Sequence, residues 1–133
     1  MTQTRMVSRR VYISCDIPER SLPEVRALHD FLQANSCEVD YSSGRDFGRH
    51  VEAVVGRCDA FVAVFAGGYS ISVAMVGELL YAHALKEVRG CGGQPRPRLF
   101  GLRVSGYDVL CPDISLEWLD RERRWNSLLE DEL

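Results

Sequence analysis

The chain has 133 residues, the length of one ordinary globular domain, so we expect a single domain over residues 1–133. Apolar residues make up 46% of the sequence and charged residues 26%, a balance typical of a soluble globular protein and unlike a disordered or fibrous chain. The net charge of -3 argues against nucleic acid as a partner, because proteins that bind DNA or RNA usually carry a dense basic face. The arginines near the start are explained by a flexible N-terminal tail over residues 1–9.

The cysteine pattern argues against disulfides and metal. Five cysteines form an odd set without a C-x-x-C pair, so we expect reduced thiols and no metal site. The N-terminus lacks an apolar signal core, and no run approaches the roughly 18 apolar residues that span a membrane. We therefore expect a cytoplasmic protein that does not contact membranes.

The first half of the chain alternates between strand and helix patterns. A short β-branched and aromatic run reads as a buried strand, and apolar residues at helical spacing follow it. Ser21 and Glu24 form a predicted capping box at the start of that helix. The next run alternates and reads as an edge strand, followed by a loop over residues 43–49. The predicted elements are a strand at 10–15, a helix at 22–35, a strand at 38–42 and a helix at 50–58.

The second half contains the strongest strand signal. Residues 60–66 are apolar throughout, which predicts a central parallel strand covered on both faces. Gly67 and Gly68 end this strand, and Ser72 is the predicted N-cap of the next helix. The pattern weakens beyond Ser105. The predicted elements are a strand at 60–66, a helix at 73–88, a Gly/Pro loop at 89–97, a strand at 98–104, a short strand at 107–110 and a helix at 116–129.

This order predicts an α/β fold: one flavodoxin-like, doubly wound parallel sheet of four to five strands with helices on both faces. In such sheets a ligand binds outside the carboxyl ends of the strands where the strand order reverses, here between the first and third strands. The two glycines would let the backbone approach a phosphate or sugar, or would simply make a tight turn. The residues expected at this rim are Ser14, Cys15, Asp16, Gly67, Gly68, Tyr69, Ser70 and Ser72.

Glu78 is an unusually placed acid. Burying an unpaired carboxylate is costly, so an acid on a small and apolar helix face indicates a functional group unless the side chain reaches solvent. Its neighbours at i-4, i-3, i+3 and i+4 are Ala74, Met75, Tyr81 and Ala82. A competing apolar face, which would leave Glu78 flanking the core, carries Val73, Val76, Leu80 and Ala84.

Three stretches resemble the TIR (Toll/interleukin-1 receptor-like) domain family of bacterial type. Residues 11–16 are similar to the family's first strand, and residues 57–72 to its third strand and following loop. Residues 72–79 match the S-x-x-x-x-x-E-L spacing that places the catalytic glutamate of TIR enzymes. The run G-E-L-L-Y-A-x-A-L also resembles, more distantly, nucleoside 2-deoxyribosyltransferase-like proteins.

The resemblance implies an NAD glycohydrolase or cyclase that cleaves the nicotinamide–ribose bond, acting in bacterial defence signalling. Glu78 would be catalytic, NAD would be the substrate, and no cofactor would be needed. Arg45 or Arg49 would meet a substrate phosphate, and Tyr69, Phe47 or Tyr81 would supply an aromatic surface. The 43–49 loop would gate the pocket and join copies into a homo-oligomer, with a separate effector or sensor protein as a further partner.

Two other functions stay open. One is a nucleoside or nucleotide N-glycosidase, or a 2-deoxyribosyltransferase-like enzyme, which is favoured because Ala74 stands where TIR enzymes commonly carry a tryptophan. The other is a non-catalytic TIR adaptor that acts through self-association. In that case Glu78 would be incidental.

Overall fold

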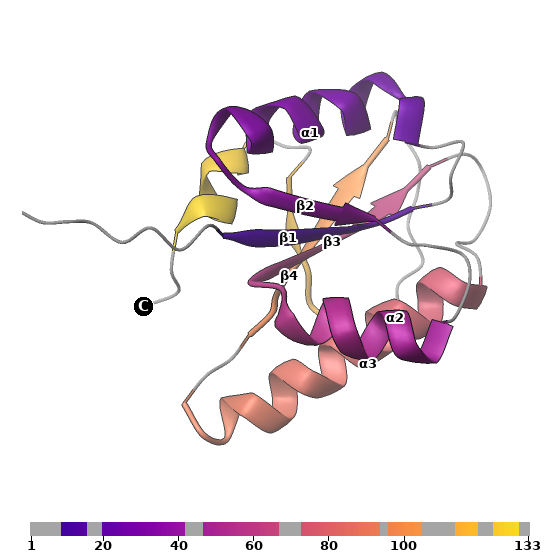
Figure 1. The fold of residues 1–133 in the computed structure, drawn as a ribbon, viewed down its shortest axis with the longest axis vertical. Helices are drawn as coiled ribbons and strands as arrows, with labels where there is room; N and C mark the ends of the chain where they lie inside the picture. Colours follow the sequence, from indigo (N-terminus) through magenta and orange to yellow (C-terminus); the bar gives the residue numbers. More distant parts are fainter. Residues whose placement is uncertain are drawn as a thin grey trace, which may run out of the picture.

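Five parallel strands form one sheet in the order β2-β1-β3-β4-β5 (Figure 1). The computed structural model describes residues 9–15, 20–41, 47–66, 73–93, 96–104, 114–119 and 124–130. The strands are β1 (Arg10–Ser14), β2 (Glu38–Tyr41), β3 (Ala60–Phe65), β4 (Arg98–Arg103) and β5 (Glu117–Trp118). The strand order reverses between β1 and β3, which confirms the predicted flavodoxin-like α/β fold.

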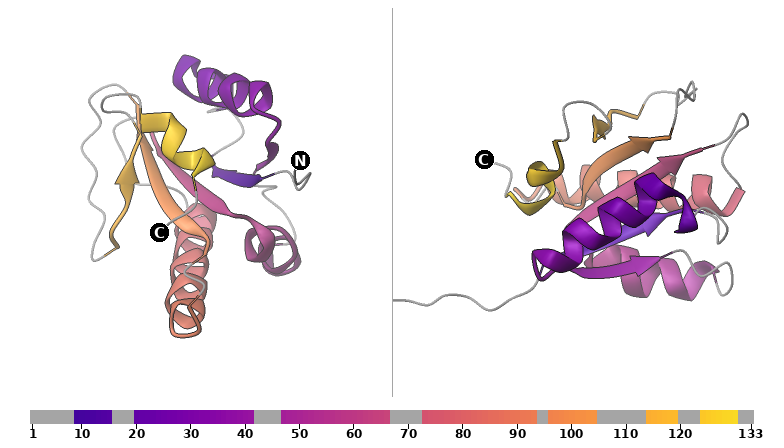
Figure 2. Two further views of the ribbon diagram at one scale, coloured as in Figure 1. Left: turned by 90° about the vertical axis from the view of Figure 1, so that its left-hand side faces the viewer. Right: turned by 90° about the horizontal axis from the view of Figure 1, so that it is seen from above.

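Helices cover both faces of the sheet. Helix α1 and the 3-10 helix η3 lie on one face, and α2 and α3 lie on the other (Figures 1 and 2). Each face has its own apolar cluster, so the sheet is the shared middle layer of two cores. The helices are α1 (Pro23–Ala34), α2 (Phe47–Val54), η2 (Val55–Arg57), α3 (Val73–Gly90) and η3 (Arg124–Leu129).

Strand β1 divides its side chains between the two cores. Val11 and Ile13, together with Cys15 directly after the strand, pack in the cluster that includes α1 residues. Tyr12 points to the opposite face, toward the cluster formed with α2 and α3. Successive strand residues face opposite sides of a sheet, so the side chain of Ser14 shares the face of Tyr12. The positions of β3 inside the sheet and of β2 at its edge confirm both strand predictions.

The start of α1 differs from the sequence prediction. The N-cap residue is Leu22, which makes no side-chain capping hydrogen bond, so the prediction of Ser21 as the N-cap is wrong. Pro23 occupies the first turn instead. Its fixed φ is already helical and its missing N–H is one that the helix start would leave unbonded. Helix α2 also begins earlier than predicted, at Phe47, and continues as the 3-10 helix η2.

The C-terminal region corrects the prediction of one helix over residues 116–129. Glu117 and Trp118 form strand β5 beside β4, and the Leu119 amide donates a hydrogen bond to the Gly101 carbonyl at 2.9 Å. Within the described residues, the helical part of this region is the 3-10 helix η3 (Arg124–Leu129). Pairing with β4 therefore overrides the local periodicity. The short strand predicted at 107–110 lies outside the described residues.

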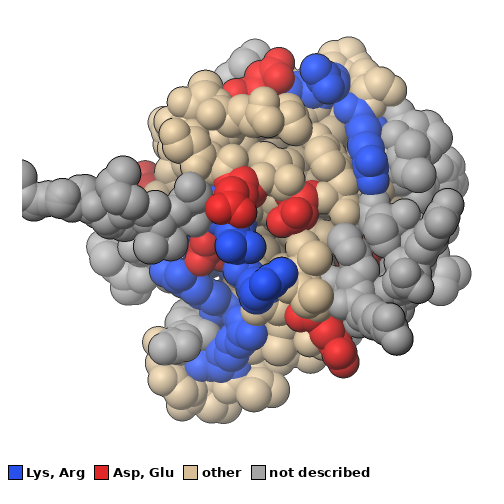
Figure 3. All heavy atoms as spheres, in the orientation of Figure 1, with Lys and Arg blue, Asp and Glu red and all other residues tan. Residues whose placement is uncertain are grey.

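The charged groups at the amino ends of the strands are interleaved. On the face shown in Figure 3, Lys and Arg side chains lie among Asp and Glu side chains. Arg96 pairs with Asp59 at 2.8 Å, and Arg10 lies 3.8 Å from Glu38. Asp59 also accepts a hydrogen bond from the backbone amide of Arg10 at 2.9 Å, which joins the start of β1 to the residue before β3.

Among the described residues, no helix combines the length and the apolar composition that a membrane-spanning helix needs.

Candidate active site

Glu78 lies on the buried face of α3. Its side chain is 2% exposed, and Met75, Leu79 and Ala82 are buried with it. The competing face is the outer one, where Val76 and Leu80 are exposed. The structure thus excludes the alternative in which Val76 and Leu80 face the core and Glu78 reaches solvent. The carboxylate is held inside the protein, in the second turn of the helix that follows β3.

Two hydroxyl groups of β1 hold the Glu78 carboxylate. The Tyr12 hydroxyl donates to Oε2 at 2.8 Å, and the Ser14 hydroxyl donates to Oε1 at 2.7 Å. Each carboxylate oxygen therefore receives a short hydrogen bond from β1. An ionised carboxylate can only accept hydrogen bonds, so these donors offset the cost of its burial. Glu78 has no cationic neighbour along α3, but its carboxylate is hydrogen-bonded to two side chains of strand β1.

The carboxylate lies where a doubly wound sheet is expected to bind its ligand. Helix α3 follows β3, and Glu78 reaches from it to β1, the strand on the other side of the switch point. Ser14 is the last residue of β1, at the carboxyl end of the sheet. Ligands of such folds bind outside this end, in the crevice where the strand order reverses. Glu78 and Ser14, both predicted site residues, are brought together at that place.

Tyr12 was not predicted as a site residue, because an aromatic side chain in a buried strand is expected to pack in the core whether or not it has a function. Its ring stacks on Phe61, with centroids 5.5 Å apart and planes 19° from parallel, and these two residues are paired between β1 and β3. A signal was present in the sequence, since Tyr12 and Ser14 are two residues apart in a strand and must face the same side. Once Ser14 is placed at the rim, the alternation points to Tyr12 as well.

Cys15 is separated from this cluster by the sheet. Its side chain is buried in the core cluster on the α1 face, opposite to Glu78. Adjacency to Ser14 in sequence therefore does not bring the thiol to the carboxylate. Phe47 opens α2, although its side chain lies outside the described part of the structure. The other predicted site residues that lie outside the described ranges are Asp16, Arg45, Gly67, Gly68, Tyr69, Ser70 and Ser72.

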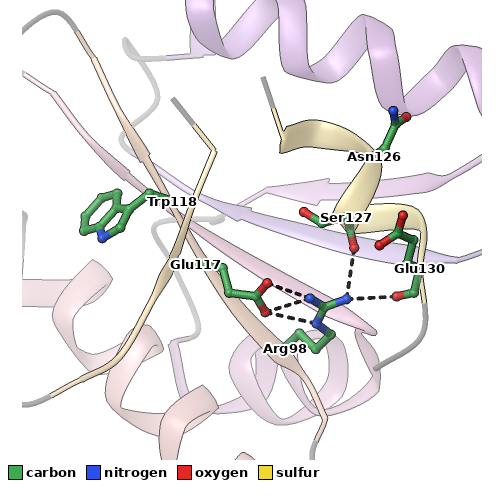
Figure 4. Close-up of a pocket in the computed structure, with 6 residues that line it drawn as sticks. All are labelled: Arg98, Glu117, Trp118, Asn126, Ser127 and Glu130. Atoms are coloured by element: carbon green, nitrogen blue, oxygen red, sulfur yellow. Dashed lines mark hydrogen bonds and ion pairs between the residues drawn. The ribbon is translucent and has the colours of Figure 1, made fainter. Parts of the chain in front are cut away.

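A cavity of about 380 Å³ lies at the other end of the sheet, around the start of β4 (Figure 4). The Arg98 guanidinium donates to both carboxylate oxygens of Glu117, at 2.6 and 2.8 Å, and to the carbonyls of Ser127 and Glu130, both at 3.0 Å. Trp118 points away from this group in Figure 4. Because Arg98 joins β4, β5 and η3 in this way, we interpret the cavity as a structural junction and place the functional site at Glu78.

The described side chains give no indication of a metal site. Among the residues that the structure describes, no group of three or more His, Cys, Asp or Glu side chains could hold a metal ion. The functional groups that the described residues bring together here are one buried carboxylate and two hydroxyls. Comparison of the chain with protein-family models and with curated proteins gave no match. The function is therefore inferred from the geometry around Glu78.

Proposed function

We propose that the chain is an enzyme that cleaves an N-glycosidic bond, with NAD as substrate and Glu78 as the catalytic carboxylate. The observation that carries this proposal is the buried Glu78 carboxylate, held by Tyr12 and Ser14 across the switch point of the sheet. Buried carboxylates are rare, and one at the ligand-binding end of a parallel sheet is a candidate for catalysis. The resemblance to TIR enzymes adds the choice of substrate.

The proposed reaction is hydrolysis of the bond between nicotinamide and ribose. The nicotinamide nitrogen leaves with the electron pair of that bond, so C1 of the ribose becomes positive in an oxocarbenium-like transition state. The fixed negative charge of Glu78 stabilises that positive charge in surroundings from which water is excluded. Water then adds to C1 and releases a proton, which gives ADP-ribose. Attack by a base of the same molecule in place of water would give a cyclic product.

Self-association belongs to the same proposal. By resemblance, the 43–49 loop would join copies of the chain and gate the site, and a separate effector or sensor protein would trigger assembly. The active form would then be a cytoplasmic homo-oligomer in a defence response.

A second candidate is a nucleoside or nucleotide N-glycosidase, or a 2-deoxyribosyltransferase-like enzyme. The sequence observation that favours it is Ala74, where TIR enzymes commonly carry a tryptophan. The carboxylate and its two hydroxyls suit this chemistry equally, because the same type of bond is broken. The substrate therefore distinguishes the two candidates.

The test is base release by the purified protein, with a crowding agent to promote assembly. The protein is incubated with NAD and separately with a panel of nucleosides and nucleotides, and released base is separated by chromatography. We expect nicotinamide release from NAD and a loss of at least about 100-fold in kcat for Glu78→Gln, since the variant lacks the charge that acts in the transition state. Glu87→Gln, an exposed acid on the same helix, is the matched control and should act like wild type.

The other outcomes of this base-release assay would contradict the proposal in different ways. Base release from nucleosides but not from NAD would replace the first candidate by the second. Equal release by wild type and by folded Glu78→Gln would show that Glu78 is not catalytic. No release from any compound, together with self-association that depends on the 43–49 loop, would favour the non-catalytic adaptor.

A further inference from the structure

The two hydroxyls that hold Glu78 are both buried, but they belong to a large stacked ring and to a small side chain near the end of β1. We propose that Tyr12 is a permanent positioning residue for the Glu78 carboxylate, whereas Ser14 binds the substrate sugar by letting one sugar hydroxyl insert between itself and Glu78. This inference rests on the proposed function and assigns different parts of the reaction to the two side chains. It also names the ligand group involved, a free hydroxyl on the sugar that carries the scissile bond.

Tyr12 is built to stay in place. Its side chain is fully buried and its ring is stacked on Phe61. The position of the hydroxyl oxygen is fixed by the ring, so the bond to Glu78 Oε2 holds as long as the core is packed. A hydrogen bond to one oxygen of a carboxylate also fixes the rotation of the other oxygen. Tyr12 therefore sets the direction in which Oε1 points.

Ser14 is placed to exchange partners. It lies two residues closer to the carboxyl end of β1 than Tyr12, which corresponds to roughly 7 Å along a strand and brings it to the rim where ligands arrive. Its hydroxyl sits on a single rotatable bond with three staggered positions. Rotation away from Glu78 Oε1 breaks one hydrogen bond, at present 2.7 Å long, without moving the backbone.

A sugar hydroxyl can complete this exchange without leaving a polar group unsatisfied. Its hydrogen would be donated to Oε1 of Glu78, and its oxygen would accept the hydrogen bond that Ser14 now gives to the carboxylate. A hydroxyl is both donor and acceptor, so it fits between an acceptor and a donor. Tyr12 is not displaced in this arrangement, and the carboxylate keeps its orientation while the substrate is bound.

The kinetic constants of two variants separate these roles. Tyr12→Phe should lower kcat by roughly 10- to 100-fold with KM within about twofold, because the misplaced charge matters most in the transition state. Ser14→Ala should raise KM by roughly 3- to 10-fold with kcat within about threefold, because its bond to the sugar is present in the ground and transition states alike. Tyr41→Phe is the matched control, since Tyr41 contacts His29 at 2.8 Å and belongs to the α1 face.

Equal effects of Tyr12→Phe and Ser14→Ala on kcat would overturn the division between the two residues. An unchanged kcat in Tyr12→Phe would overturn the positioning role. If the wild-type protein releases no base from any compound, the proposed function fails and the sugar-binding role of Ser14 fails with it.

The Tyr12–Glu78 bond has a readout that needs no substrate. Unfolding by urea is measured for Tyr12→Phe, Glu78→Gln and the double variant. The two substitutions should be non-additive in the free energy of unfolding, whereas Tyr41→Phe and Glu78→Gln should add, because Tyr41 and Glu78 lie on opposite faces of the sheet. Additivity of Tyr12→Phe with Glu78→Gln would refute the positioning role even in an inactive protein.

Discussion

The indole ring of Trp118 lies against the backbone of Gly101, so closely that a Cβ atom at position 101 would stand 2.6 Å from ring atom Cζ3 and 2.8 Å from Cε3. The two residues are paired between β4 and β5. The Arg103 guanidinium covers the ring at 4.5 Å, and the Phe65 ring lies 5.7 Å away. The edge strand β5 is thus held to the sheet by a large ring resting on a residue without a side chain.

Replacing Gly101 by alanine should lower the free energy of unfolding by roughly 1–3 kcal/mol, because the added methyl group overlaps the indole ring. Urea denaturation measures the effect. Gly56→Ala is the control, since the nearest atom to its Cβ would be the Tyr81 hydroxyl at 3.9 Å, and it should change stability by less than about 1 kcal/mol. Equal stabilities of Gly101→Ala and wild type would contradict the described position of Trp118.

Arg98→Ala should loosen the C-terminal part of the chain. The Arg98 side chain is 13% exposed and bonds Glu117 together with the carbonyls of Ser127 and Glu130, so its removal should cost roughly 2 kcal/mol. Hydrogen exchange over residues 124–129 should become faster. Arg96→Ala removes a pair whose arginine is 48% exposed and should cost less than about 1 kcal/mol. Similar losses in the two variants would argue against a junction at Arg98.

The Cys58 thiol should be inert in the folded protein. Burial raises its pKa to about 12, and the nearby Asp59 charge adds to this effect, so the reactive thiolate is scarce at pH 8. Iodoacetamide should modify the exposed Cys91 in the native state and Cys58 only after unfolding, as read by peptide mass spectrometry. Native-state modification of Cys58 at the rate of Cys91 would refute this prediction.

The same thiol makes stability depend on pH. In the unfolded chain a cysteine ionises near pH 9, whereas the folded protein keeps the Cys58 proton up to about pH 12. Above pH 9 the unfolded state therefore binds fewer protons than the folded state, and stability falls as pH rises from 9 to 12. Cys58→Ala should flatten this part of the stability profile, measured by urea denaturation. An unchanged slope would assign the pH dependence to another group.

The outer face of α3 should accept charge. Leu80 is 53% exposed and Val88 is 71% exposed, so Leu80→Lys and Val88→Lys should each change the free energy of unfolding by less than about 0.5 kcal/mol. The same substitution at the buried Ala82 should cost about 3 kcal/mol or more, because it buries an unpaired cation. Similar costs at Leu80 and Ala82 would mean that the helix is rotated from its described position.

Most of the sheet could be predicted because its strands carry strong local signals. The apolar run of β3 requires cover on both faces, and the helices between strands require parallel crossovers. Strand β5 could not be found in this way. It has two residues, and it is defined by the fit of Trp118 on Gly101 and by the Arg98–Glu117 pair, which are contacts between residues far apart in sequence. Helix α1 was predicted at 22–35 and extends over Pro23–Ala34, so only its N-cap residue was assigned wrongly.

Two residues of the candidate site, Glu78 and Ser14, could be predicted from the periodicity of the helix and from the ends of the strands. The helical neighbours of Glu78 indicated an acid on a small and apolar face, and the strand ends indicated Ser14 at the same edge. The partner of Glu78 was not visible along α3, because Tyr12 and Ser14 come from another strand and the pairing exists only in three dimensions. Cys15 shows that neighbours in sequence can lie apart in space. It follows Ser14 directly in the chain, but its side chain lies on the other face of the sheet.

The alternation of side chains along β1 also bears on how the sheet assembles. A slip of one residue between β1 and its neighbours would turn Tyr12 and Ser14 to the α1 side and present Val11, Ile13 and Cys15 to α3. The Glu78 carboxylate would then be buried without a hydroxyl donor from β1, at a cost of several kcal/mol. The register of β1 and the burial of Glu78 are therefore coupled, because only the observed register supplies both hydroxyl donors to the carboxylate.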